Sequence, residues 1–363
     1  MAESGLTREQ LEFFAVNGYV VLENVADAEA FAAARDAAWE GMLGGVTRDP
    51  ETWDRPVCDC RGAQGMAERF GLVKLRKHIR SSSALQAVSV LNPRLLAVGR
   101  QLLGSSALSP ELFRGVYPIF PTPESAGNPV SAHLDVTPTP FKLTYSVYLA
   151  DIPPGGGALS VWPSSHRLLH GATATNACNL SDFETREFRA AYAHLNQQTP
   201  RVLPGKAGTT VVMHYRLLHA ASINRIPGHV RWALYFNQAS SDVSFATGKP
   251  SDNLWEGWEG IDHIDADWVR RTREPATLAS LTPVEPTRHD ITRVGAWNAF
   301  ASDMARAQER FRRADAAAER NSATPAAALT PLPSRKQEPS HVPRAPRVEG
   351  LTALRRLLAR PGF

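Results

Sequence analysis

The sequence predicts a mainly β fold with flanking helices, built as an antiparallel sandwich or barrel. From about residue 112, short runs of β-branched and aromatic residues alternate with clusters of Pro and Gly, a pattern typical of antiparallel strands. Before this point the chain carries helix start and stop signals instead. We therefore expect helices first and a β core after them.

Three helices are predicted in the N-terminal part. Each begins after a side chain that can cap a first helical turn: Thr7, Asp27 and Asn92. Thr7 and Gln10 have the spacing of a capping box, and Asn17-Gly18 can end the first helix before an extended run, residues 19–22. The second helix is expected to end near Met42 and the third at Gly104.

Six segments are predicted to form the strands of the β core: Phe113–Phe120, Ala132–Val136, Leu143–Leu149, Leu159–Trp162, Thr209–His214 and Val230–Asn237. The run 153–157, Pro-Pro-Gly-Gly-Gly, predicts a tight reversal. Residues 181–198 are expected to be helical and to interrupt the strands. After Ser240, we expect Trp255, Trp258 and Trp268 to pack an extension against the core, followed by a polar helix over 292–320.

We expect one domain over residues 1–320, with its β core at about 112–240, and a Pro-rich basic tail over 321–363. The tail holds seven Arg or Lys residues against two Glu, a balance of +5, which leaves about −1 for the rest of a chain of net charge +4. A nearly neutral body argues against nucleic-acid binding. Six prolines and no aromatic residue in 321–346 predict disorder there, and 348–360 predicts a short helix whose partner is unknown.

No stretch approaches eighteen consecutive apolar residues, and the polar N-terminus lacks the pattern of a secretory signal. The three cysteines lack the spacing of a structural zinc site. We therefore expect no membrane association and a cytoplasmic location.

The most specific motif is His133-Leu134-Asp135. Residues i and i+2 of a strand share a face, so this segment can present an imidazole and a carboxylate to one metal ion. His219, which follows the predicted strand 209–214, is a candidate third ligand. Two His and one carboxylate on one side of a metal form the triad of non-haem Fe(II) oxygenases. A His–Asp pair in a surface turn is the alternative interpretation.

Arg231 lies in an apolar predicted strand, where a fixed positive charge needs an anionic partner. A guanidinium can bind a carboxylate through two hydrogen bonds. The partner is therefore either the carboxylate of a bound ligand or an acidic side chain in an internal salt bridge.

Taken in order, four blocks resemble the signatures of the phytanoyl-CoA dioxygenase family: His133-x-Asp135, residues 156–166, residues 214–219 with Asn224, and residues 231–234. The N-terminal residues 6–22 are also similar. The resemblance implies a double-stranded β-helix (jelly roll, cupin-like) with Fe(II), 2-oxoglutarate as cosubstrate, and O2. It also implies that His133, Asp135 and His219 bind the metal and that Arg231 holds the distal carboxylate of 2-oxoglutarate.

Three further residues are candidates for contacts with 2-oxoglutarate. Thr144 and Ser146 share one face of a predicted strand, although they are also consistent with solvent-facing hydroxyls. Tyr117 is the third candidate, and a core tyrosine is its alternative role. The sequence departs from the family pattern at Ser146, where family members carry a bulky aromatic residue, and at Ala221, where they often carry a hydroxyl residue.

We therefore expect an Fe(II)/2-oxoglutarate-dependent dioxygenase that hydroxylates, or otherwise oxidises, a small molecule and releases succinate and CO2. Asp135 favours this outcome over halogenation, because related halogenases have a small residue at its position. The alternatives are a cupin-type metal-dependent isomerase or hydrolase without 2-oxoglutarate, and a non-catalytic jelly-roll binding module.

Overall fold

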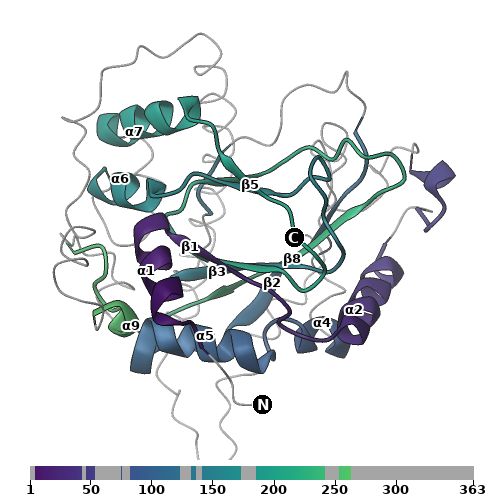
Figure 1. Ribbon diagram of the computed structural model, residues 1–363, viewed down its shortest axis with the longest axis horizontal. Coiled ribbons are helices and arrows are strands. Elements are labelled where there is room, and N and C mark those ends of the chain that lie inside the picture. The colour runs from purple at the N-terminus through teal and green to yellow at the C-terminus, as the bar shows by residue number, and fades with distance from the viewer. Residues whose placement is uncertain are drawn as a thin grey trace, which may run out of the picture. The chain divides into compact units, whose positions relative to one another are not determined.

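The computed structural model describes residues 5–42, 46–53, 75, 82–122, 132–135, 141–172, 185–241 and 253–262. Two antiparallel sheets form its β core (Figure 1). The larger sheet has the strand order β1 (Tyr19–Leu22), β6 (Thr210–His214), β3 (Leu143–Tyr148), β8 (Arg231–Gln238) and β2 (Glu111–Ile119). The smaller sheet has the order β5 (Arg201–Leu203), β4 (Leu159–Val161) and β7 (His219–Ala221). Two such sheets are what the predicted jelly roll requires.

The three predicted helices are present as α1 (Arg8–Asn17), α2 (Ala28–Glu40) and α5 (Pro93–Leu103). Thr7 and Gln10 make both bonds of the capping box, which confirms the predicted start of α1. Gly18 ends that helix at φ 79°, a conformation in which glycine carries no steric penalty. Seven short elements were not predicted: strands β5 and β7, and the helices η1 (Pro50–Thr52), α4 (Ser83–Ala87), η3 (Gly104–Ser106), α6 (Ser165–Gly171) and α9 (Glu259–Asp262).

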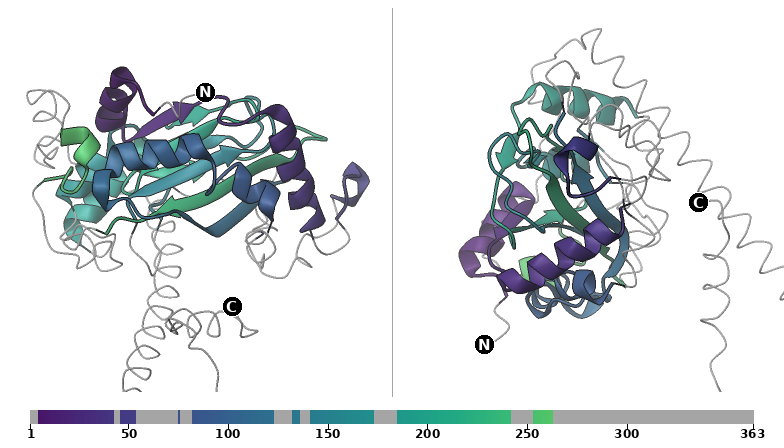
Figure 2. Two further views of the ribbon diagram at one scale, coloured as in Figure 1. Left: turned by 90° about the horizontal axis from the view of Figure 1, so that it is seen from below. Right: turned by 90° about the vertical axis from the view of Figure 1, so that its right-hand side faces the viewer.

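The helices α1, α2 and α5 pack against one face of the larger sheet, and α5 runs across it (Figure 2). Leu95 and Val98 of α5 belong to the same buried cluster as Tyr145 and Val147 of β3 and Phe236 of β8. Because side chains alternate along a strand, the residues between them face the interior of the jelly roll. Thr144, Ser146 and Arg231 lie on this interior face of the larger sheet, whereas His219 lies on the smaller sheet.

Two helices pack on the smaller sheet, α6 (Ser165–Gly171) and α7 (Arg186–Gln197). The predicted helix over 181–198 is confirmed in α7, whose first turn is capped by Thr185. Leu169 of α6 and Phe188 of α7 are buried in one cluster with Leu218, next to β7. This layer supports the strand that carries His219.

The prediction of a strand over Ala132–Val136 was wrong for the residues that the structure describes. Its described part, residues 132–135, forms a single bridge between His133 and His219 and no continuous ladder. His133 is the one described residue of the segment that pairs with β7, and a single pair does not make a strand. The side chains nevertheless alternate as a strand would present them, with Leu134 buried in the α6/α7 layer and Asp135 directed to the opposite side.

The C-terminal part is described only in part. Trp255 and Trp258 are buried in the main core, as predicted, and Lys142 donates to the carbonyls of Glu256 and Gly257 at 3.0 Å. Trp268, the predicted helix over 292–320 and the tail over 321–363 lie outside the described residues and stay predictions. Within the described residues, no helix combines the length and hydrophobicity that crossing a membrane requires.

Candidate metal centre

His133 and His219 are brought together by the backbone. His133 N–H donates to the His219 carbonyl at 2.9 Å, and His219 N–H donates to the His133 carbonyl at 3.1 Å. The two imidazole rings consequently lie with their centroids 4.6 Å apart. The bridge therefore aligns two nitrogen ligands that are distant in the sequence.

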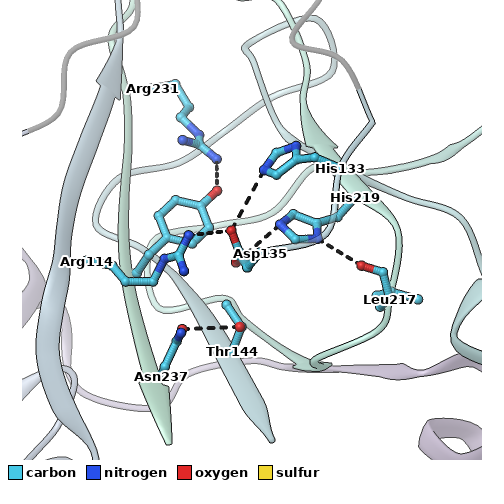
Figure 3. Close-up of polar contacts among 9 residues, drawn as sticks. Arg114, His133, Asp135, Thr144, Leu217, His219, Arg231 and Asn237 are labelled. Atoms are coloured by element: carbon cyan, nitrogen blue, oxygen red, sulfur yellow. Dashed lines mark hydrogen bonds and ion pairs between the residues drawn. The ribbon is translucent and has the colours of Figure 1, made fainter. Parts of the chain in front are cut away.

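Asp135 completes the cluster. Its Oδ2 lies 3.5 Å from His219 Nε2, and its Oδ1 lies 3.8 Å from His133 Nε2 (Figure 3). One ligand atom from each of the three residues lies within 4.8 Å of the other two. Asp135 and His219 are buried, whereas the His133 side chain keeps 27% of its surface exposed. The centre is therefore open on the side of His133.

The ring of His219 is oriented by a second contact. Its Nδ1 lies 2.9 Å from the Leu217 carbonyl oxygen, which only a protonated nitrogen can satisfy. This hydrogen bond places the proton on Nδ1 and leaves the lone pair of Nε2 directed at Asp135. Metal-binding histidines commonly have this arrangement, because it fixes both the tautomer and the ring.

Arg114, on β2, forms an ion pair with Asp135 that the sequence did not reveal. In a regular strand Arg114 would face away from Tyr117, towards the helices. A register shift between Glu111 and Gly115, with Gly115 at φ 111°, turns the Arg114 side chain into the interior. The Arg114-Gly115 pair in the sequence does not by itself indicate a bulge, so sequence reasoning missed this residue.

The charge of Asp135 depends on these neighbours. Burial opposes ionisation of the carboxyl group, but the Arg114 guanidinium beside it holds the pKa of Asp135 well below its usual range. The carboxylate therefore stays ionised at neutral pH, as a metal ligand must be.

Arg231 is fully buried at the start of β8. Its Nη1 donates to the Tyr117 carbonyl at 3.1 Å and its Nη2 to the Tyr235 hydroxyl at 2.6 Å, while Nε has no partner. No carboxylate among the described residues forms an ion pair with Arg231. The described part of the chain thus contains no internal salt bridge that would account for this buried charge.

The other three candidates lie on the same interior face. Thr144 and Ser146 are buried, which rules out their alternative role as solvent-facing hydroxyls. Thr144 Oγ1 donates to Asn237 Oδ1 at 3.2 Å, and Ser146 Oγ has no hydrogen-bond partner. Tyr117 is partly buried and packs against Tyr235 with ring centroids 5.1 Å apart. This packing fits its alternative role as a core tyrosine, and a contact with 2-oxoglutarate stays a prediction.

The residues present fit Fe(II) and 2-oxoglutarate. Two imidazoles and a carboxylate are ligands that suit Fe(II) and leave positions open. Several buried polar atoms around them lack a partner in the described structure: Arg114 Nη1, Ser146 Oγ, Arg231 Nε and Asn237 Nδ2. Buried polar groups in proteins are nearly always hydrogen-bonded, so this interior is built to receive a polar ligand.

A comparison with protein-family models identifies the chain. Residues 14–231 match the model of phytanoyl-CoA dioxygenase (PhyH). The chain belongs to this family. It is therefore an Fe(II)- and 2-oxoglutarate-dependent enzyme of the oxygenase type, and its cofactors are Fe(II), 2-oxoglutarate and O2. Among curated proteins, none matches the chain.

Solved structures of low sequence identity resemble the chain. The non-haem α-ketoglutarate-dependent carbocyclase SnoK from nogalamycin biosynthesis is 20% identical, with a TM-score of 0.46, over 69% of this chain and 95% of SnoK. EctD from S. alaskensis with 2-oxoglutarate and 5-hydroxyectoine is 21% identical, with a TM-score of 0.43, over 69% of this chain and 83% of EctD. HygX from Streptomyces hygroscopicus with nickel and 2-oxoglutarate is 17% identical, with a TM-score of 0.43, over 65% of this chain and 87% of HygX.

Proposed function

We propose that this PhyH-family enzyme hydroxylates, or otherwise oxidises, an unactivated C–H bond of a small molecule, with release of succinate and CO2. In this proposal His133, Asp135 and His219 bind Fe(II), and Arg231 binds the distal carboxylate of 2-oxoglutarate. The observation that supports it best is the buried Arg231 guanidinium, which has no carboxylate partner among the described residues and lies on the interior face of the larger sheet, near the His-Asp-His cluster.

The residues of the chain would bind and orient the reactants. Arg114 keeps Asp135 ionised, and the Leu217 carbonyl keeps His219 Nε2 available as a ligand. Apolar side chains of the interior, among them Val161, Val211 and Leu217, exclude water from the space between the sheets. When bound, Fe(II) with 2-oxoglutarate and O2 supplies the oxidising chemistry, and the protein supplies alignment of the C–H bond.

A cupin-type isomerase or hydrolase would use the same three ligands without 2-oxoglutarate. Such chemistry does not require a buried guanidinium that can bind a dicarboxylate. A non-catalytic binding module has no need for an ionised carboxylate between two oriented imidazoles. Arg231 and Asp135 therefore favour the oxygenase over both alternatives.

The proposal is tested on full-length protein loaded with Fe(II) without oxygen. Addition of 2-oxoglutarate should produce the metal-to-ligand charge-transfer band of the chelate, and exposure to O2 should then convert 2-oxoglutarate to succinate. His219→Ala should show neither signal, whereas His194→Ala, on α7, should show both. A wild-type protein that binds Fe(II) but gives no band and no succinate would contradict the proposal and favour the cupin-type alternative.

A further inference from the structure

Two buried nitrogen donors on the interior face have no hydrogen-bond partner in the described part of the chain, Arg114 Nη1 and Asn237 Nδ2. Neither belongs to the set of residues proposed to hold the metal or 2-oxoglutarate. A buried N–H group without an acceptor is rare in folded proteins. The two donors therefore indicate a further ligand group.

Arg114 is held so that its Nη1 has no hydrogen-bond partner among the described residues. Nη2 pairs with Asp135 Oδ1, which fixes the plane of the guanidinium next to the metal centre. The side chain is only 15% exposed. Because a guanidinium presents its N–H groups as a rigid fork, Nη1 is held in a defined direction beside the bond to Asp135.

Asn237 is oriented by Thr144. The Thr144 hydroxyl donates to Asn237 Oδ1 at 3.2 Å, so the amide oxygen is already occupied and Nδ2 points elsewhere. Asn237 keeps only 2% of its surface exposed. In Figure 3 the Thr144–Asn237 pair lies below Asp135, Arg231 lies above it, and Arg114 lies beside it, between the two.

The strand register separates Asn237 from Arg231, and Arg114 lies between the two. Arg231 and Asn237 are six residues apart on β8, so they face the same side with Cα atoms about 20 Å apart. Asn237 is paired with Glu111, next to the bulge that directs Arg114 inwards. A five-carbon dicarboxylate bound at Arg231 and at the metal therefore does not extend to Asn237.

We propose that Arg114 and Asn237 bind a carboxylate group of the substrate, and that the enzyme accordingly acts on a small carboxylic acid. One cationic and one neutral N–H donor suit an anionic pair of oxygens, whereas a neutral amide or ester would gain less from the charge of Arg114. This inference rests on the proposed function, because it places the substrate beside the proposed iron site.

The test uses full-length protein with Fe(II) and saturating 2-oxoglutarate in the absence of O2. Hexanoate, cyclohexanecarboxylate and phenylacetate are titrated against their primary amides, and the charge-transfer band reports binding near the metal. In the wild type, at least one acid should perturb the band at a concentration at least tenfold below its amide. Asn237→Leu and Arg114→Gln should each remove this preference, while Arg189→Gln, an exposed arginine of α7, should retain it.

Three results would overturn the inference. The first is equal midpoints for every acid and its amide in the wild type. The second is an acid preference that survives in both variants. The third is a tenfold higher 2-oxoglutarate midpoint in Arg114→Gln with an unchanged acid preference, which would assign Arg114 to the cosubstrate. If the wild type forms no charge-transfer band with 2-oxoglutarate, the proposed function itself fails, so the two failures are distinguishable.

Discussion

The backbone of His133 is paired with that of His219 by two hydrogen bonds, 2.9 and 3.1 Å long, so the two imidazoles are aligned by main-chain atoms. Because no side chain takes part in this bridge, either imidazole can be removed without breaking it. Metal binding and folding at this centre are therefore separable by mutation.

We expect His219→Ala to lose Fe(II) binding while the fold is retained. The substitution removes one of three ligands, so affinity should fall by more than about 100-fold, the upper end of the losses seen when residues that merely support ligands are replaced. Metal titration and thermal unfolding measure the two effects, with His194→Ala as the matched control. Near-normal iron binding by His219→Ala would show that the cluster is not the metal site.

Asp135→Ala should also lose Fe(II), but at a cost in stability that His219→Ala does not have. Removal of this carboxylate leaves the Arg114 guanidinium buried without its partner. We therefore expect a lower melting temperature for Asp135→Ala and a partial recovery in the double variant Asp135→Ala/Arg114→Gln. Equal melting temperatures for the three variants would contradict a buried ion pair.

Arg231→Ala should weaken 2-oxoglutarate binding while Fe(II) affinity stays nearly unchanged. Truncation of one partner of a buried charge pair costs about 2–5 kcal/mol, and each 1.4 kcal/mol is tenfold, so the titration midpoint should rise more than roughly 25-fold. Arg231→Lys should recover only part of the loss, because an ammonium lacks the forked geometry. An unchanged midpoint in folded Arg231→Ala would remove the support for Arg231 as the anchor.

The protein should lose stability as the pH falls below about 6.5, because His166 and His214 are buried as neutral imidazoles. Burial lowers the pKa of His166 to about 3, and burial together with the neighbouring His166 and Arg216 lowers the pKa of His214 well below its usual value. Below pH 6.5 the unfolded chain binds protons that the folded chain does not. Each histidine should therefore reduce the free energy of unfolding by about 1.4 kcal/mol per pH unit.

Denaturant unfolding at pH 7.5, 6.5 and 5.5 measures this dependence. His166→Gln should have a shallower pH dependence than the wild type, since it removes one of the two protonation sites, whereas His194→Gln should leave the dependence unchanged. The same slope in His166→Gln and the wild type would mean that His166 is not held neutral by the fold.

Site residues could be predicted from the sequence where their neighbours in the chain alone indicated their role. The spacing of His133 and Asp135 was visible in three residues, and Arg231 was conspicuous as a charge within an apolar run. Arg114 gave no such signal, because its direction depends on a bulge opposite β8 rather than on its neighbours in sequence. Asn237 was predicted only as part of a strand, and the free donor that it presents depends on Thr144 of another strand.

The amino-acid sequence by itself determined the β class of the core, the boundaries of α1 and most strands, and the residue types available for a metal, because capping, alternation and turn chemistry are local properties. Tertiary structure alone decided that His133 meets His219 through one bridge, that Arg114 faces inwards, and that Arg231 has no carboxylate partner among the described residues. These facts depend on register between strands far apart in the chain, and register is set by packing of the whole interior.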